Sequence, residues 1–209
     1  MPGGANQLGV LARLLATNAP CKLCYPKESR DESEQREPTV EEIIAGVASY
    51  YRGERELYVR HSEPLDAALR AVIARYFSAG LLDKVKTITL RGARIPPPWF
   101  YAQAKEMSGG NFPDFVHLAS FTYIDVLVFH DEITPRALFH AAVHATQMEV
   151  LGFERYIELY VRGFVKNRSW LAIPLEQQTY KLEARFAESS DIFSVEDEIK
   201  VWDEDGRYL

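Results

Sequence analysis

The sequence contains few cysteines. Cys21 and Cys24, in the segment CKLC, are the only two among 209 residues. Because a four-cysteine zinc site needs a second pair, a complete site of that kind is excluded. We interpret the pair as ordinary thiols in a mobile N-terminal segment; a redox pair and half of a zinc site are the alternatives.

Long apolar runs are also missing. No run approaches the roughly 20 residues that a helix needs to cross a bilayer, so a membrane-spanning protein is not expected. A short apolar stretch near the start is interrupted by Arg13, and no basic region precedes it, which argues against a signal peptide. We therefore expect a cytoplasmic protein.

The chain has no excess of positive charge. Its formal net charge is −6, and surfaces that bind nucleic acid or anionic membranes need clustered Lys and Arg. We therefore do not expect nucleic acid or a membrane as a partner; we expect a small molecule, a peptide or a protein. Apolar residues make up 47% of the chain and charged residues 26%, which is typical of a globular protein with a real core.

The pattern along the chain predicts one folded domain with two appendages. Residues 25–38 are highly charged and end in proline, so we interpret residues 1–38 as a flexible N-terminal segment and linker. Residues 39–190 form the domain. Residues 191–209 are acidic with isolated apolar residues, which indicates a solvated tail; a tail that lies across a neighbouring surface or the cleft as an internal inhibitor is the alternative.

Two helices are predicted at the start of the domain. Thr39 and Glu42 form a capping-box pattern, and we expect a helix from there to about Tyr51. A second helix is expected from about Ser62 to Gly80, because apolar residues recur on one helical face.

Strand patterns follow. Apolar and polar residues alternate in VKTITLRGARI, and FVHLASFTYIDVLVFHDE is rich in β-branched and aromatic residues and ends in strand structure near His130. From Thr134, a cap followed by Pro135, three helical segments are expected, over about 137–150, 153–165 and 175–188. The fold class is therefore α+β: N-terminal helices, a small, mostly antiparallel sheet, and a helical C-terminal region.

The first C-terminal helix carries two histidines four residues apart. His140 and His144 therefore share a helical face and can converge on one metal ion. A catalytic zinc usually has three protein ligands, and Glu176 is the natural third one, on a later helix where Tyr180 and Glu183 share its face. The alternative is a metal-free interaction domain in which the histidines pack or face solvent.

The segments TPRALFHAAVHATQMEVLGFERYIELYVRGF and IPLEQQTYKLEARF resemble the gluzincin branch of zinc metallopeptidases. In that family a His-Glu-x-x-His helix and a glutamate on a later helix bind zinc, and a group of small bacterial proteins reads HELVHVVQ and IPLExQAYxLxARF. The resemblance implies a zincin-like fold, zinc bound by His140, His144 and Glu176, and an extended peptide held along a strand edge, for which FTYIDVLVF is the candidate.

Two positions depart from the family pattern. The general-base glutamate falls on Ala141, which has no proton-transfer chemistry. The aspartate that in many gluzincins supports a histidine falls on Tyr180, whose phenol is a candidate for a hydrogen bond to a ligand or an oxyanion.

These departures shape the expected function. The resemblance implies peptide hydrolysis by a zinc-activated water, with the reaction lost because Ala141 replaces the base. Two origins of the alanine are open: a natural pseudoenzyme that uses the site for structure or binding, or an engineered Glu→Ala variant. We favour the second, because the rest of the ligand set matches.

Other polar and aromatic residues are given structural interpretations. Gln147 is a candidate support for the metal site, although helix-surface polarity explains it equally well. We interpret the stripe that contains Tyr156 and Tyr160 as core packing and His130 as a turn-capping or solvent-facing residue.

Overall fold

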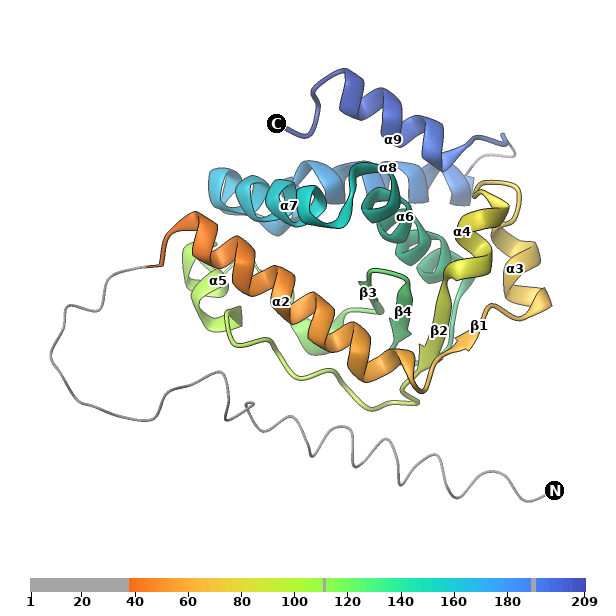
Figure 1. Ribbon diagram of the computed structural model, residues 1–209, viewed down its shortest axis with the longest axis horizontal. Helices are drawn as coiled ribbons and strands as arrows, with labels where there is room; N and C mark the ends of the chain where they lie inside the picture. The colour runs from red at the N-terminus through yellow and green to blue at the C-terminus, as the bar shows by residue number, and fades with distance from the viewer. Residues whose placement is uncertain (1–37, 111, 189–190) are drawn as a thin grey trace, which may run out of the picture.

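The computed structural model describes residues 38–110, 112–188 and 191–209, which form an α+β fold with a small four-stranded sheet (Figure 1). The predicted N-terminal segment, with Cys21 and Cys24, lies outside the described residues apart from Pro38. Within the described ranges, none of the helices has both the length and the apolarity to cross a membrane.

Helix α2 (Val40–Val59) begins as predicted. The Thr39 side chain accepts a hydrogen bond from the Glu42 backbone N–H, and the Glu42 carboxylate accepts one from the Thr39 N–H. The predicted end at Tyr51 is wrong, because the helix continues for about two more turns. Tyr58 in those turns is buried and holds this end of α2 in the core.

The predicted helix from Ser62 to Gly80 is also wrong. The segment contains strand β1 (Glu63–Pro64), helix α3 (Ala67–Ile73) and helix α4 (Ala79–Lys84). Its division follows from two cap residues. The side chains of Asp66 and Ser78 each accept a hydrogen bond from a backbone N–H three residues on, at 2.8 and 3.1 Å, so each starts a helix of its own.

The sheet is mixed. Strands β2 (Lys86–Thr89), β3 (Ser120–Tyr123) and β4 (Val126–Phe129) join β1 in the order β1-β2-β4-β3. Two of the three pairings are antiparallel, as predicted for most of the sheet, but β2 and β4 are parallel. The chain between β2 and β3 passes through helix α5 (Tyr101–Met107) and the short 3₁₀ helix η1 (Phe115–His117), and this long connection allows the parallel pairing.

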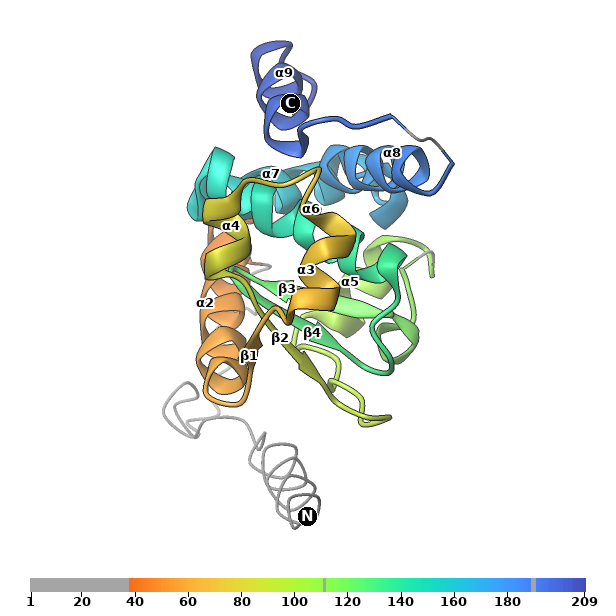
Figure 2. The same cartoon turned by 90° about the vertical axis from the view of Figure 1, so that its right-hand side faces the viewer.

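Helix α6 (Pro135–Leu151) is the central element. It begins as predicted, with the Thr134 hydroxyl accepting a hydrogen bond from the Ala137 N–H at 3.2 Å and proline in the first turn. Figures 1 and 2 show α6 between the sheet on one side and helices α8 (Pro174–Glu188) and α9 (Val195–Glu204) on the other. Most of its residues are buried, so a site on α6 has rigid support.

The expected solvated tail is instead a helix that packs on the core. Val195 and Ile199 of α9 are fully buried, and Tyr208 beyond its end is 3% exposed. Apolar residues four apart form one helical face, while acidic residues occupy the first turn, where the helix dipole favours negative charge. Helix α7 (Phe153–Asn167) and the 3₁₀ helix η2 (Trp170–Ala172) connect α6 to α8.

Candidate metal centre

The two histidines of α6 face each other. The Nε2 atoms of His140 and His144 lie 3.2 Å apart, one helical turn from each other. His144 is buried, and His140 is partly exposed toward a cavity. The predicted spacing therefore brings both rings to one point.

Glu176 reaches the same point from α8, which packs along α6. Its Oε2 atom lies 3.6 Å from His144 Nε2, and one ligand atom from each of His140, His144 and Glu176 lies within 4.8 Å of the others. Atoms bound to a tetrahedral zinc at about 2.0–2.1 Å are about 3.3–3.4 Å apart. The three residues predicted as ligands are thus brought together and could hold a metal ion.

The chemistry of these atoms fits a cation. Glu176 Oε2 is buried, and among the described residues it has no hydrogen-bond partner; its neighbour His144 Nε2 lies 3.6 Å away. A buried carboxylate oxygen without a hydrogen bond is costly. Glu176 Oε1, by contrast, accepts a hydrogen bond from the Tyr160 hydroxyl at 2.8 Å. One oxygen is held by the protein, and the other is left for an ion.

His140 is oriented by Glu183, also on α8. The Nδ1 atom of His140 lies 2.6 Å from Glu183 Oε2, and Arg136 pairs with the other carboxylate oxygen. Because a carboxylate accepts the hydrogen bond, Nδ1 carries the proton and Nε2 presents a lone pair to the metal position.

This contact is the one that the family resemblance assigned to position 180. Tyr180 instead packs its ring against His140, with centroids 5.0 Å apart. Burial raises the pKa of Tyr180 to about 12, so its phenol stays protonated at neutral pH. The supporting acid is therefore Glu183, seven residues after Glu176, which sequence reasoning placed on the correct face without giving it a role.

Gln147 orients His144. Its side-chain oxygen lies 3.0 Å from His144 Nδ1, while its amide nitrogen donates to the Leu175 carbonyl and to Gln178 Oε1, each at 3.0 Å. The Tyr156 hydroxyl is a second neighbour of His144 Nδ1, at 3.3 Å. Of the two interpretations of Gln147, the structure supports the one in which it holds a predicted ligand, because Gln147 is fully buried.

The aromatic stripe of α7 is more than core packing. Tyr156 and Tyr160 are both on this helix, and each contacts a predicted ligand through its hydroxyl group. The indole N–H of Trp170 donates in turn to the Tyr160 hydroxyl. The helical spacing of the stripe gave no signal for these polar contacts, because they depend on how α7 packs against α6 and α8.

Burial and polar neighbours act in opposite directions on the pKa values at this site. Burial lowers the pKa of His144, but Glu176, Gln147 and Glu183 together outweigh burial and raise it. Burial raises the pKa of Glu176, but His144, His140 and the Tyr160 hydroxyl together lower it below its ordinary value. For Glu183, the hydrogen bonds and charges of His140 and Arg136 together outweigh burial and lower its pKa.

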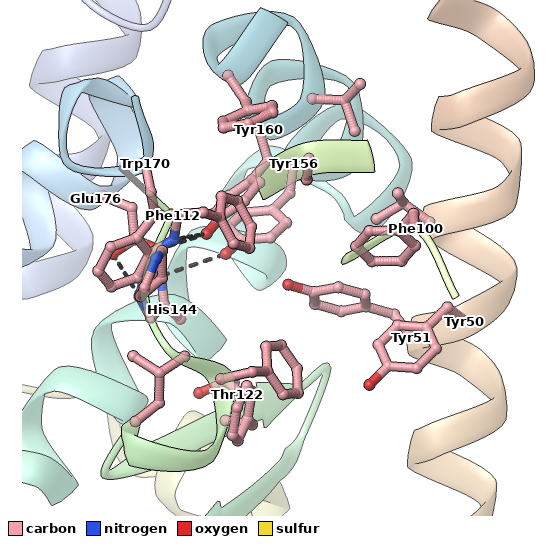
Figure 3. A pocket seen from close by; sticks show the side chains of 18 of the residues that line it. Tyr50, Tyr51, Phe100, Phe112, Thr122, His144, Tyr156, Tyr160, Trp170 and Glu176 are labelled. Carbon is pink, nitrogen blue, oxygen red and sulfur yellow. Dashed lines mark hydrogen bonds and ion pairs between the residues drawn. The ribbon is translucent and has the colours of Figure 1, made fainter. Parts of the chain in front are cut away.

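A cavity of about 360 Å³ opens onto the ligands (Figure 3). Figure 3 shows Tyr50, Tyr51 and Phe100 on the side of the cavity opposite His144 and Glu176. Most of the lining is aromatic or aliphatic, and it contains no Lys or Arg among the described residues. Residues 191–209 do not line the cavity, so α9 does not act as the alternative internal inhibitor within it.

Ala141 is fully buried and does not line the cavity. Its carbonyl oxygen accepts a hydrogen bond from the Thr122 hydroxyl of β3 at 3.0 Å, which links α6 to the sheet. The acidic residues that line the described cavity are Glu176 and Glu183. Both oxygens of Glu183 are engaged, by His140 and Arg136, whereas Glu176 is engaged by Tyr160 through Oε1 and its Oε2 lies at the predicted metal position.

His130 is a structural residue, but it does not face solvent. It is 1% exposed, and its Nε2 atom accepts a hydrogen bond from the Ile95 N–H at 3.1 Å. Burial lowers its pKa, so the ring is neutral at physiological pH.

Comparison with protein-family models, curated proteins and solved structures found no match for this chain. Evidence for a metal centre therefore comes from the chain's own residues and their geometry.

Proposed function

We propose that the protein is a zinc-binding metallopeptidase scaffold in which His140, His144 and Glu176 are the ligands. The observation that carries this proposal is the convergence of three ligand atoms around a buried Glu176 oxygen that has no hydrogen-bond partner. Two histidines and a glutamate are a ligand set found in catalytic zinc sites, and a zinc ion supplies Lewis acidity that polarises a carbonyl group.

The substrate that the cavity suits best is a peptide with uncharged, large apolar side chains. Strand β3 is at the edge of the sheet, and all four of its residues line the cavity, so an extended peptide has backbone groups to pair with. The aromatic lining favours apolar groups, and the described lining has no Lys or Arg to attract an anion.

The missing base limits the chemistry. Loss of a general base typically costs about 10²–10⁴ in rate, whereas metal binding depends only on the ligands and their supports. Ala141 cannot accept a proton, Glu183 is engaged by His140 and Arg136, and Glu176 is a proposed metal ligand. We therefore infer a protein that binds zinc and peptide and hydrolyses the peptide very slowly.

A second candidate is a natural pseudoenzyme whose zinc stabilises a peptide-binding module. The acidic residues of the described cavity lining favour it, because Glu183 is engaged by His140 and Arg136 and Glu176 is a proposed ligand, so neither replaces the base. The two candidates share a metal site and differ in what a restored glutamate does.

The deciding experiment compares the protein with its Ala141→Glu and Ala141→Gln variants. Glutamine matches the size of glutamate without its basicity, so it controls for the buried position. The scaffold proposal predicts about one zinc per chain in all three and chelator-sensitive hydrolysis of an apolar peptide pool only with glutamate. Zinc-loaded, folded Ala141→Glu protein without hydrolysis would favour the pseudoenzyme. Absence of zinc from all three, or its retention in His140→Ala, would refute the metal site.

A further inference from the structure

A chain of buried hydrogen bonds connects the C-terminal segment to His144. The Tyr208 hydroxyl donates to Gln178 Oε1, and the Gln147 amide nitrogen donates to the same oxygen at 3.0 Å. Gln147 Oε1 then lies 3.0 Å from His144 Nδ1. Three helices or their extensions thus meet in one polar chain that ends at a proposed ligand.

Each amide in this chain has only one satisfactory orientation. The Gln178 amide nitrogen donates to the Glu198 carbonyl oxygen of α9 at 3.1 Å, so the Gln178 oxygen must face Gln147 and Tyr208. The Gln147 nitrogen donates to the Leu175 carbonyl and to Gln178, so the Gln147 oxygen must face His144. Carbonyl oxygens only accept hydrogen bonds, and reversal of either amide would place two acceptors together.

The Gln147 end of this hydrogen-bond chain determines which ring nitrogen of His144 carries the proton. Because Gln147 Oε1 can only accept, the proton of the neutral ring resides on Nδ1, with Tyr156 as a second neighbour at 3.3 Å. The Nε2 atom is then left with its lone pair toward His140 and Glu176. A histidine ligand needs this arrangement, in which one nitrogen binds the ion and the other is held by the protein.

Burial makes the chain sensitive to the loss of any member. Gln147 and Gln178 are 0% exposed and Tyr208 is 3% exposed, so bulk water cannot easily replace a lost partner. Arg155 on α7 also holds this segment through Asp203, with a pair at 2.8 Å, but that contact lies outside the chain.

We propose that Tyr208, acting through Gln178 and Gln147, is a positioning residue that holds His144 in its metal-binding form. The proposal rests on the zinc site proposed above. It assigns to α9 and Tyr208 a contribution to metal affinity in addition to their packing on α6.

The first test measures the zinc dissociation constant of the folded full-length protein by competition with a chromophoric chelator. Tyr208→Phe removes one hydroxyl and is expected to weaken binding about fivefold, the size of one net hydrogen bond. Tyr58→Phe is the matched control, because the Tyr58 hydroxyl is buried and has no hydrogen-bond partner. Its dissociation constant should stay within about twofold of the unchanged protein.

The second test is a double-mutant cycle, which a purely structural role would not satisfy. Gln147→Met breaks the chain next to His144 and is expected to weaken zinc binding about 10- to 100-fold. Because Gln147→Met already interrupts the hydrogen-bond chain, adding Tyr208→Phe to that variant should cause no further loss of zinc affinity.

The outcomes are separable. Equal dissociation constants for Tyr208→Phe and Tyr58→Phe would overturn the positioning role while leaving the zinc site intact, as would full additivity in the cycle. Failure of the unchanged protein to bind zinc would instead refute the proposed function. If Gln147→Met does not fold, the comparison of the two Tyr→Phe variants still decides.

Discussion

Replacement of Glu54 by glutamine should stabilise the protein at neutral and alkaline pH and leave its stability at acid pH unchanged. Glu54 is 9% exposed on α2, close to Tyr50, Tyr58 and Tyr123, and within the described part of the chain its Oε2 atom has no hydrogen-bond partner. Burial raises its pKa from 4.5 to about 7, because the ionised carboxylate loses its hydration.

The expected loss of stability follows from the difference between the pKa of Glu54 in the folded and the unfolded chain. Below pH 4.5 the carboxyl group is protonated in both folded and unfolded chains, and its full contribution to stability is present. Between pH 4.5 and about 7 the unfolded chain ionises while the folded chain keeps its proton, so the free energy of unfolding falls as pH rises. The total loss is up to about 3 kcal/mol, and glutamine, which does not ionise, avoids it.

The assay is urea unfolding of the Glu54→Gln and unchanged proteins between pH 4 and pH 8, with chelator present throughout. The difference in unfolding free energy should be near zero at pH 4 and approach about 3 kcal/mol at pH 8. Glu56→Gln removes an exposed carboxylate from the same helix, and its difference should stay within about 0.5 kcal/mol. A difference for Glu54→Gln that does not change with pH would refute the reasoning.

Two further predictions concern the support of the predicted metal ligand His140 and the docking of α9. Glu183→Gln keeps an acceptor for His140 but loses the charge, so zinc affinity should fall about 10- to 100-fold. Glu188→Gln, at an exposed position of the same helix, is the control. Equal zinc affinities of the two variants would contradict the role of Glu183. Ile199→Ala should lower the free energy of unfolding, measured in denaturant titrations, by about 2–4 kcal/mol. Val201→Ala, at a position that is 48% exposed, should change it little. Similar losses in the two variants would contradict the docking of α9.

Local chemistry made parts of the fold predictable. Thr39 and Thr134 each cap a helix through a contact with a backbone N–H only three residues away, so the starts of α2 and α6 could be predicted correctly. The burial of Val195 and Ile199 could not be predicted, because a short acidic helix with two buried apolar residues is stable only against the surface that covers it. Packing against α6 therefore determines that residues 195–204 form a docked helix.

The same distinction holds for the site. The helical spacing of His140 and His144 is local, and Glu176 is indicated by the resemblance, so this group could be proposed from sequence. Glu183 shares a face with Glu176 and could have been singled out by that spacing. The contacts of Tyr160 depend on the packing of α7 against α8, for which the sequence carries no separate signal.

The parallel pairing of β2 with β4 also has a kinetic meaning. Lys86 lies opposite Val126, so the pairing brings together residues forty positions apart and closes a long loop. That loop contains Phe100 and Phe115, which line the cavity. Because a pairing between distant residues forms slowly, the wall of the cavity is expected to assemble together with the sheet, late in folding. The cavity and the sheet are therefore expected to form as one cooperative unit.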